Sequence, residues 1–182
     1  MLTAAEGQRG LASHDWPYGW EIRVRIGMHT GIHQRRRALG EMSREERRMS
    51  DWNAKVIEEF RSNEGRVASF ARQPLLLLTH RGARSGTLRT NPLAFFRDGD
   101  DYVIVASKGG AETNPDWYHN LLTEPRATIE VGTEQMDVTA RPADEDERER
   151  LWAMITAANP AFADYEQKTT RTIPVFILSP VG

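Results

Sequence analysis

The sequence contains no cysteine, and this absence excludes disulfide bonds, thiolate zinc sites, thioredoxin-like redox motifs and a cysteine nucleophile. Long apolar runs are also missing. Purely apolar stretches such as Leu75–Leu78 and Val175–Leu178 fall far short of the roughly 20 residues that a membrane-spanning helix needs. The chain also begins without the basic and then apolar pattern of a secretory leader. We therefore predict a soluble, cytoplasmic protein.

Neither sign of charge dominates the 182-residue chain, whose 24 basic and 26 acidic residues give a formal net charge of −2. This balance gives no global reason to expect a nucleic acid as a partner. With 39% hydrophobic and 27% charged residues, the composition is typical of a globular protein. The length predicts one domain with an appendage, because a single domain commonly holds about 150 residues.

The first 48 residues lack a lasting apolar period, and glycines interrupt them repeatedly. They carry nine arginines against six acidic residues, whereas residues 49–182 carry more acidic than basic residues. We predict that residues 1–48 are a poorly structured N-terminal extension and that residues 49–182 are the folded domain. A start codon assigned too far upstream would explain the extension, since Met49 is a natural start for the folded unit.

After the extension the pattern becomes regular. Ser50 is a candidate N-cap for a helix in which Trp52, Val56 and Phe60 recur every four residues, and Gly65 ends it. Further helices are predicted from Asn114-Pro115, with Pro at the first helical position, at residues 144–158 and, as a turn or short helix, at 160–168. Strands are predicted at residues 74–80, 88–97, 102–107, 127–131, 136–140 and 173–179. Short strands joined mostly by hairpins predict an antiparallel, barrel-like α+β fold.

Positive charge is concentrated at residues 65–97, which hold six arginines and no acidic residue. Arg84 and Arg89 belong to a turn whose glycines leave backbone N–H groups accessible, and a guanidinium binds phosphate or carboxylate through two parallel hydrogen bonds. A second cationic turn, Ser107-Lys108-Gly109-Gly110, follows the third predicted strand. We expect the two turns to lie at the same end of the barrel and to bind an anion. The alternative is that these arginines are ordinary solvated charges.

Other motifs that carry chemistry are missing. There is no GxGxxG after a strand and no GxxxxGK[ST], so a Rossmann or P-loop nucleotide site is not supported. GARSG does not have its serine at the centre of GxSxG, as a nucleophile elbow requires. His29 and His33 have the spacing of a metal pair but lack the HExxH glutamate and a helical context. We predict no metal site.

Motifs that follow one another from Trp52 to Pro180 carry a resemblance to a known family. They are Asn53…Val56-Ile57…Phe60-Arg61, Gly82-Ala83-Arg84-Ser85-Gly86…Arg89, Asn91-Pro92-Leu93, Asp98-Gly99-Asp100, Val105-Ala106-Ser107-Lys108-Gly109-Gly110, Asn114-Pro115…Trp117-Tyr118…Asn120-Leu121 and Thr170-Arg171…Ile173-Pro174-Val175. This run resembles the deazaflavin-dependent nitroreductase and quinone-reductase family, which uses coenzyme F-420. The resemblance implies an FMN-binding-like split antiparallel β-barrel with peripheral helices, so that residues 49–182 form a deazaflavin-binding domain.

The resemblance also implies the site. Arg84, Arg89 and Lys108 suit the phosphodiester and glutamate tail of the coenzyme, while backbone groups of two strand segments line its ring. Trp117 has an alternative role as a core residue of its helix. The implied cofactor-binding residues are Ala83, Arg84, Ser85, Arg89, Thr90, Asn91, Pro92, Leu93, Ala94, Val105, Ala106, Ser107, Lys108, Trp117, Tyr118 and Asn120.

Two residues are predicted to be catalytic. By resemblance, Ser107 lies near the reacting edge of the ring, although its alternative role is that of a turn serine before glycines. Nitro-reducing members of the family close a tyrosine-rich stretch over the substrate. In this sequence the corresponding stretch is residues 159–165, and its only tyrosine is Tyr165, a candidate proton donor. Asn159 and Phe162 occupy positions where the family's nitro-reducing members have tyrosines. This departure favours quinone-like or other conjugated acceptors over nitro compounds.

The leading prediction is therefore an oxidoreductase that transfers a hydride from reduced coenzyme F-420 to a quinone, nitro or enone acceptor. FMN is the less favoured alternative cofactor, since split barrels host both. A third alternative is a non-catalytic protein that binds the deazaflavin or an apolar ligand. Peripheral contact with the inner face of the plasma membrane is compatible with a menaquinone acceptor, but no amphipathic basic helix in the folded domain requires it.

Overall fold

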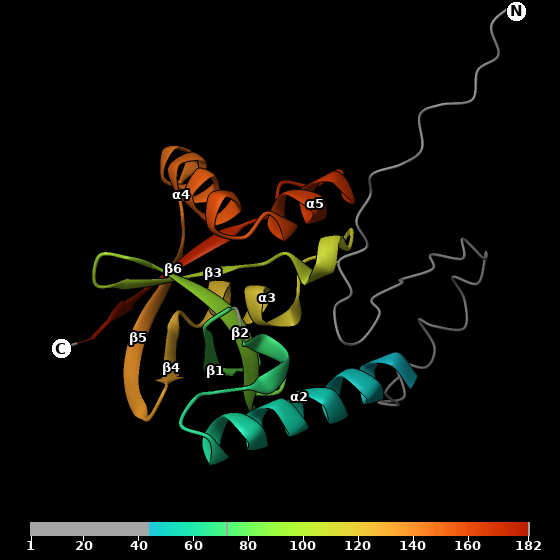
Figure 1. Cartoon of the computed structure of the whole chain (residues 1–182), viewed down its shortest axis with the longest axis vertical. Helices are drawn as coiled ribbons and strands as arrows, with labels where there is room; N and C mark the ends of the chain where they lie inside the picture. Colours follow the sequence, from blue (N-terminus) through green and yellow to red (C-terminus); the bar gives the residue numbers. More distant parts are fainter. Residues whose placement is uncertain (1–43, 72, 182) are drawn as a thin grey trace, which may run out of the picture.

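A computed structural model describes residues 44–71 and 73–181 of the chain (Figure 1). The helices are α2 (Arg44–Ser62), α3 (Asp116–Thr123), α4 (Glu145–Ala158) and α5 (Ala161–Gln167), with 3-10 turns η1 (Ala68–Phe70) and η2 (Lys108–Gly110). The strands are β1 (Leu75–Arg81), β2 (Leu88–Asp98), β3 (Asp101–Val105), β4 (Arg126–Val131), β5 (Glu134–Pro142) and β6 (Val175–Pro180).

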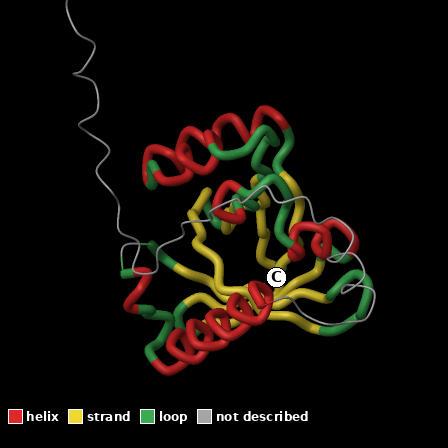
Figure 2. The backbone as a smooth tube through the Cα atoms, turned by 90° about the vertical axis from the view of Figure 1, so that its right-hand side faces the viewer, coloured by secondary structure: helices red, strands yellow, loops and turns green. Residues whose placement is uncertain are grey.

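The six strands form one closed antiparallel barrel in the order β1-β2-β3-β6-β5-β4. Hairpins join β1 to β2, β2 to β3 and β4 to β5, whereas α3 and the pair α4–α5 form the two longer connections. Closure leaves no unpaired strand edge. The barrel and its peripheral helices confirm the predicted α+β split-barrel fold (Figure 2).

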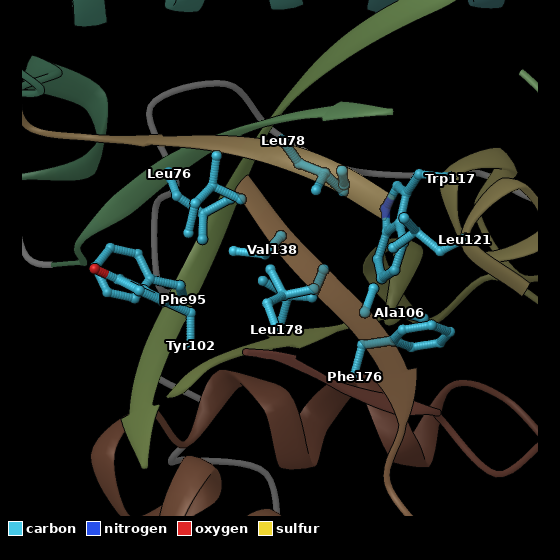
Figure 3. Close-up of a cluster of buried hydrophobic side chains, with 14 residues drawn as sticks. Leu76, Leu78, Phe95, Tyr102, Ala106, Trp117, Leu121, Val138, Phe176 and Leu178 are labelled. Carbon is cyan, nitrogen blue, oxygen red and sulfur yellow. The ribbon is translucent and has the colours of Figure 1, made fainter. Parts of the chain in front are cut away.

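Side chains alternate between the inside and the outside of the barrel, because the side-chain period of a strand is two residues. Inward-facing residues such as Leu76, Leu78, Phe95 and Leu178 form the central core (Figure 3). Trp117 is 4% exposed and packs edge-on against a phenylalanine of β6, with ring centroids 5.7 Å apart. Helix α3 therefore contributes its apolar face to the core at one end of the barrel.

Two helical layers cover the outside of the barrel. Helix α2 packs Val56 and Phe60 on the outward side chains of β1, where Leu77 is fully buried. Helices α4 and α5 cover the outward face of β2, β3 and β6, and Phe162 of α5 packs against Phe96 of β2. Figure 1 shows these two layers on opposite sides of the barrel. A strip of β2 and β3 lies between them.

Two predicted helix starts need correction. Helix α2 begins at Arg44, six residues before the predicted cap Ser50, because residues 44–49 are mostly strong helix formers that continue the helix outward. Pro115 is the N-cap of α3 rather than its first residue. Residues 1–43 of the predicted extension, including His29 and His33, lie outside the described residues. The domain boundary at residue 48 stays a prediction, although α2 crosses it.

Each helix in the two described segments is too short or too polar to cross a membrane.

Candidate active site

The two glycine-containing turns lie at the same end of the barrel. Strand β1 runs towards Arg81, and the antiparallel β2 starts beside it, with Leu88 opposite Arg81. Strand β3 returns antiparallel to β2, so its last residue, Val105, points back to that end. The turn at residues 82–87 leads into β2, and the turn at residues 107–110 follows β3, the neighbour of β2, so both turns lie at the same end of the barrel, as the sequence predicted.

Backbone hydrogen bonds fix the first turn, which we call the arginine turn (residues 82–87). Gly82 N donates to Thr87 O over 2.9 Å, and Gly86, with a φ of 68°, donates to Gly82 O over 2.8 Å. Arg81 Nη1 donates to Gly86 O over 2.8 Å. The guanidinium groups of Arg84 and Arg89 remain exposed. The ion pairs of the described residues include neither of them.

The second turn, which we call the lysine turn (residues 107–110), has three successive residues with positive φ. Ser107 is in the right-handed helical region, whereas Lys108, Gly109 and Gly110 have φ values of 48°, 64° and 84°. A right-handed residue followed by a left-handed one turns successive N–H groups towards one point and forms an anion-binding nest. Residues 44–71 and 73–181 supply no acceptor for the N–H groups of residues 107–109. A non-glycine residue at positive φ is a strained feature that clusters at functional sites.

Arg171 holds the segment after β3 in place, a role that the sequence analysis did not assign. Its half-buried guanidinium donates to Ala111 O over 2.9 Å, to Asn114 Oδ1 over 2.6 Å, and to the carbonyls of Ala106 and Ser107 over 2.9 and 3.0 Å. Burial lowers the pKa of Arg171 from its ordinary value. The signal for this residue was its place in the last family motif, just before β6, but only the fold shows its contacts.

The structure divides the predicted strand segment between two surfaces. Leu93 packs on the central core inside the barrel. Ala94 instead packs on the outer side beneath α2, and Pro92 pairs with the outward residue Leu77 of β1. Side chains of successive strand residues point to opposite faces, so residues 90–94 cannot all present side chains to one ligand. Ala106 and Trp117 are likewise core residues, 0% and 4% exposed.

The outward residues Pro92, Ala94 and Val105 of β2 and β3, together with Ser107 just after β3, form a half-buried strip between the layers of α2 and α5. We call it the outer strip. It begins beside both cationic turns, and three of its four side chains are apolar. Such a surface suits a flat, largely apolar ring with its charged substituent extending towards the turns.

Helix α5 packs directly on the lysine turn. A Cβ on Gly110 would lie 2.9 Å from Tyr165 O and 2.8 Å from Lys168 Cβ, so only glycine allows this approach. Tyr165 also packs on Phe162, with ring centroids 5.7 Å apart, and both Tyr165 and Val105 pack against the outer apolar cluster that contains Phe162. Burial, with a smaller contribution from the nearby carboxylate of α5, raises the pKa of Tyr165 from its ordinary value. The fold thus brings the two predicted catalytic residues, Ser107 and Tyr165, to neighbouring segments.

Outside this end, the described residues offer little that resembles a reaction centre. They contain no group of three or more histidine, aspartate or glutamate side chains that could hold a metal ion. A hollow of about 890 Å³ lies between the end of α2 and the start of β1, lined by residues such as Glu59, Phe70 and Gln73. None of the predicted site residues lines it, because it belongs to the opposite end of β1.

The closed barrel, with arginine and lysine side chains gathered at one end, defines a split-barrel protein with a candidate site for an anionic cofactor. The particular family is established by comparison with known proteins. The chain belongs to the F420H(2)-dependent quinone reductase family, whose family model matches residues 52–180.

Individual relatives agree with this assignment. The chain is 39% identical over 125 residues to an F420H(2)-dependent quinone reductase of Mycobacterium tuberculosis, a match that covers 66% of this chain and 84% of the relative. A solved F420-H2 dependent reductase (FDR-A) shares 40% identity at a TM-score of 0.54 and covers 58% of this chain and 94% of its own. A second structure, described as a domain-swapped dimer, shares 35% identity at a TM-score of 0.56 and covers 71% and 98%.

The family makes the chain an oxidoreductase that uses reduced coenzyme F-420. FMN and non-catalytic ligand binding, the two alternatives, are therefore set aside. The residues present fit this coenzyme, because the cationic groups Arg84, Arg89 and Lys108 stand at one end of the molecule with the nest of the lysine turn. These groups match a tail that carries phosphodiester and carboxylate charges.

Proposed function

We propose that the chain transfers a hydride from reduced coenzyme F-420 to a quinone at the outer strip. The observation that carries this proposal is the placement of the arginine turn, the lysine turn and the outer strip side by side at one end of the barrel. A charged tail and an apolar ring of one molecule can be bound there together.

The charged part of the site binds and orients the coenzyme. Arg84 and Arg89 offer planar guanidinium groups that can each bind a phosphate or carboxylate through two hydrogen bonds. Lys108 Nζ donates to Thr113 Oγ1 over 3.0 Å, which holds the ammonium group beside the lysine turn. Each charge-assisted hydrogen bond contributes about 1.5–3 kcal/mol. Binding energy from this remote tail then fixes the ring on the outer strip.

The apolar part of the site positions the reaction and excludes water. When bound, reduced coenzyme F-420 supplies a hydride, because the carbon that replaces nitrogen in its ring disfavours one-electron chemistry. Pro92, Ala94 and Val105 provide the apolar surface for the ring, and α5 closes the strip on the side of the lysine turn.

A quinone that accepts a hydride also requires a proton. The hydroxyl of Tyr165 is protonated at neutral pH, as that of an ordinary tyrosine is, and burial raises its pKa further. We assign it the role of proton donor to the quinone oxygen. Ser107 directly follows the core residue Ala106, and we assign its hydroxyl to a hydrogen bond with the ring or the acceptor.

The stretch around Tyr165 supports a quinone as the acceptor. Phe162 is 7% exposed and packs against Phe96, so it is part of the outer core. Asn159 Nδ2 donates to Gln73 Oε1 over 2.9 Å. This hydrogen bond links the end of α4 to the segment just before β1. Neither residue offers the hydroxyl of the tyrosines that it replaces. We expect slow reduction of nitro compounds, and enones to rank below quinones.

Anaerobic oxidation of reduced coenzyme F-420 by menadione tests this proposal. The wild-type protein should catalyse it, and the Tyr165→Phe variant should lower the turnover number about 100-fold, the contribution typical of a positioned acid. Coenzyme affinity should not change in this variant, because the phenyl ring keeps the packing on Phe162. Unchanged turnover would remove Tyr165 from the mechanism, and absence of wild-type turnover would contradict the proposed reaction.

A cytoplasmic location, with peripheral contact at the inner face of the plasma membrane, is part of the same proposal because menaquinone dissolves in lipid. Co-sedimentation with anionic phospholipid vesicles that contain menaquinone tests the contact. Recovery of all the protein in the supernatant would contradict it.

A further inference from the structure

A buried histidine lies where the arginine turn, β2 and α3 meet. His80 is 2% exposed and follows Leu76 and Leu78 on the inner face of β1. Its Nε2 lies 2.9 Å from Asn91 Oδ1, and its Nδ1 lies 3.3 Å from Asn120 Nδ2. The sequence alone does not indicate a role for His80, because its two partners lie 11 and 40 residues away in the chain.

The position of the imidazole proton follows from a backbone amide. Ala83 N can only donate, and it lies 2.9 Å from Asn120 Oδ1. The other end of that amide, Nδ2, therefore faces His80 and donates, so His80 Nδ1 must accept. The ring proton is then on Nε2, where it donates to Asn91 Oδ1. This chain of hydrogen bonds has a single consistent direction, from Asn120 through His80 to Asn91.

The surroundings keep this imidazole neutral. Burial is the largest cause that lowers the pKa of His80, and the guanidinium of Arg89, directly opposite on β2, lowers it further. The hydrogen bond to Asn91 and the carboxylate of Asp116 on α3 act in the opposite direction but are weaker. Neutral His80 therefore predominates at physiological pH.

We propose that His80 is a positioning residue for coenzyme binding: as a neutral Nε2–H imidazole it fixes the arginine turn against β2 and α3. This inference rests on the proposed function, since it concerns the same site. Asn91 and Asn120 are implied coenzyme contacts, and Ala83 precedes Arg84 directly. One imidazole thus sets the relative position of three segments that must bind one ligand.

Protonation of His80 breaks this arrangement. It places an N–H on Nδ1 against the N–H groups of Asn120 Nδ2, so two donors face each other. Asn120 can relieve the conflict only by turning its amide, which gives up the hydrogen bond from Ala83 N. The arginine turn is then released, and coenzyme affinity falls as the pH drops through the pKa of His80.

The ring protonation can be observed without the coenzyme. Long-range proton–nitrogen NMR spectra of the full chain labelled with ¹⁵N-histidine, recorded from pH 5 to pH 8, identify the His80 signals by their loss in a His80→Gln variant. We expect the Nε2–H form at pH 8 and protonation below the ordinary histidine range. Protonation of Nδ1 in the neutral ring, or titration at the ordinary value, would overturn the assignment.

The effect on binding is measured by equilibrium dialysis with coenzyme F-420. His80→Phe keeps a planar ring, of somewhat larger volume, but removes both hydrogen bonds, and we expect a loss of affinity of about tenfold at pH 8. His80→Gln can both donate and accept and should recover most of the affinity. Between pH 8 and pH 5 the wild type should lose about tenfold more affinity than His80→Gln, because titration of the coenzyme itself is common to both.

Thr128→Val is the matched control. It removes a cross-strand side-chain hydrogen bond of similar length, 2.8 Å to Asp137, on the exposed pair β4–β5. We expect its affinity to equal that of the wild type. Equal affinity of His80→Phe and wild type, or the same pH dependence in His80→Gln and wild type, would overturn the role of His80 alone. Failure of the wild type to bind at any pH would overturn the proposed function, and with it this inference.

Discussion

The turns at the two ends of strand β2 differ in whether their charged side chains form ion pairs. At the β2–β3 hairpin, Asp98 accepts two hydrogen bonds from Arg150 of α4, over 2.9 and 2.7 Å. At the other end of the same strand, Arg84 and Arg89 are exposed, and the ion pairs within the described segments do not include them. Asp98 at the hairpin end is thus paired within the protein, whereas Arg84 and Arg89 have no ion-pair partner among the described residues.

The comparison also separates stability from function. An exposed ion pair such as Arg150–Asp98 contributes little to folding, since solvent screens it and two long side chains lose freedom. Two adjacent cations without an acid destabilise the fold slightly through repulsion. Their placement at this end of β2 agrees with the proposed binding of an anionic coenzyme.

The largest effect should come from removing Arg84 of the arginine turn together with Arg89, which follows the turn at the start of β2. We expect the double variant Arg84→Ala, Arg89→Ala to lose about 100-fold in affinity for coenzyme F-420, because two charge-assisted contacts are lost. Equilibrium dialysis measures the affinity, and the melting temperature should stay within a few degrees of the wild type. A double variant that binds normally would show that these arginines are only solvated charges.

The next largest effect is expected at Gly110, the glycine of the lysine turn that lies against α5. Gly110→Ala places a Cβ against the backbone of α5 at a φ of 84°, and we expect destabilisation of roughly 1–3 kcal/mol and a fall in quinone turnover of about tenfold, because α5 must move. Thermal unfolding and menadione turnover measure the two effects.

Gly99→Ala is the control. It sits at a φ of 62° in the hairpin and meets no atom within 4 Å. It should share the backbone strain but leave turnover unchanged. Equal turnover in both variants would mean that the contact of α5 with the lysine turn is unimportant for the reaction.

Much of this fold follows from local patterns in the sequence. Alternating residues such as Ala127, Ile129 and Val131 mark a half-buried strand, and the Asp98-Gly99-Asp100 turn fixes a hairpin register. The two cationic turns could be placed at one barrel end from strand direction alone. The predicted start of α2 was wrong, because the charged residues before Ser50 show no apolar period, although they favour a helical backbone.

The interior of the site could not be predicted in the same way. Asn120 reaches Ala83 and His80 across about 40 residues of sequence, and Arg171 reaches the carbonyls after β3 across more than 60. Such contacts depend on how α3 and the start of β6 pack against the barrel end. A local pattern identifies the residues as polar, but it does not identify their partners.

A smaller effect is expected at the hairpin end of β2. Arg150→Ala removes the ion pair with Asp98, and we predict only a small loss in the free energy of unfolding, with coenzyme affinity unchanged, because solvent screens an exposed pair. Urea unfolding and dialysis provide the two measurements. A marked loss of affinity would show that the two ends of β2 are coupled.

The smallest effect is expected on the stability of the fold when the pH is lowered. Hydrogen bonds from Arg141, and from the backbone of Asp144, lower the pKa of Glu147 to about 2. Because the folded pKa lies below the ordinary value of 4.5, the stabilisation is complete above that value and is lost as the pH falls towards 2. Glu147→Gln should flatten this part of the stability profile. Identical pH profiles for variant and wild type would contradict the role of this pair.

The central claim is that the unbalanced cations of the arginine and lysine turns bind the anionic tail of coenzyme F-420. Equilibrium dialysis of the wild-type protein against coenzyme F-420, and against the same deazaflavin without its phosphodiester and glutamate tail, tests it most directly. We predict that the complete coenzyme binds at least about 100-fold more tightly, and that this preference shrinks as the salt concentration rises. Equal affinity for the two compounds, or no binding of either, would contradict the account.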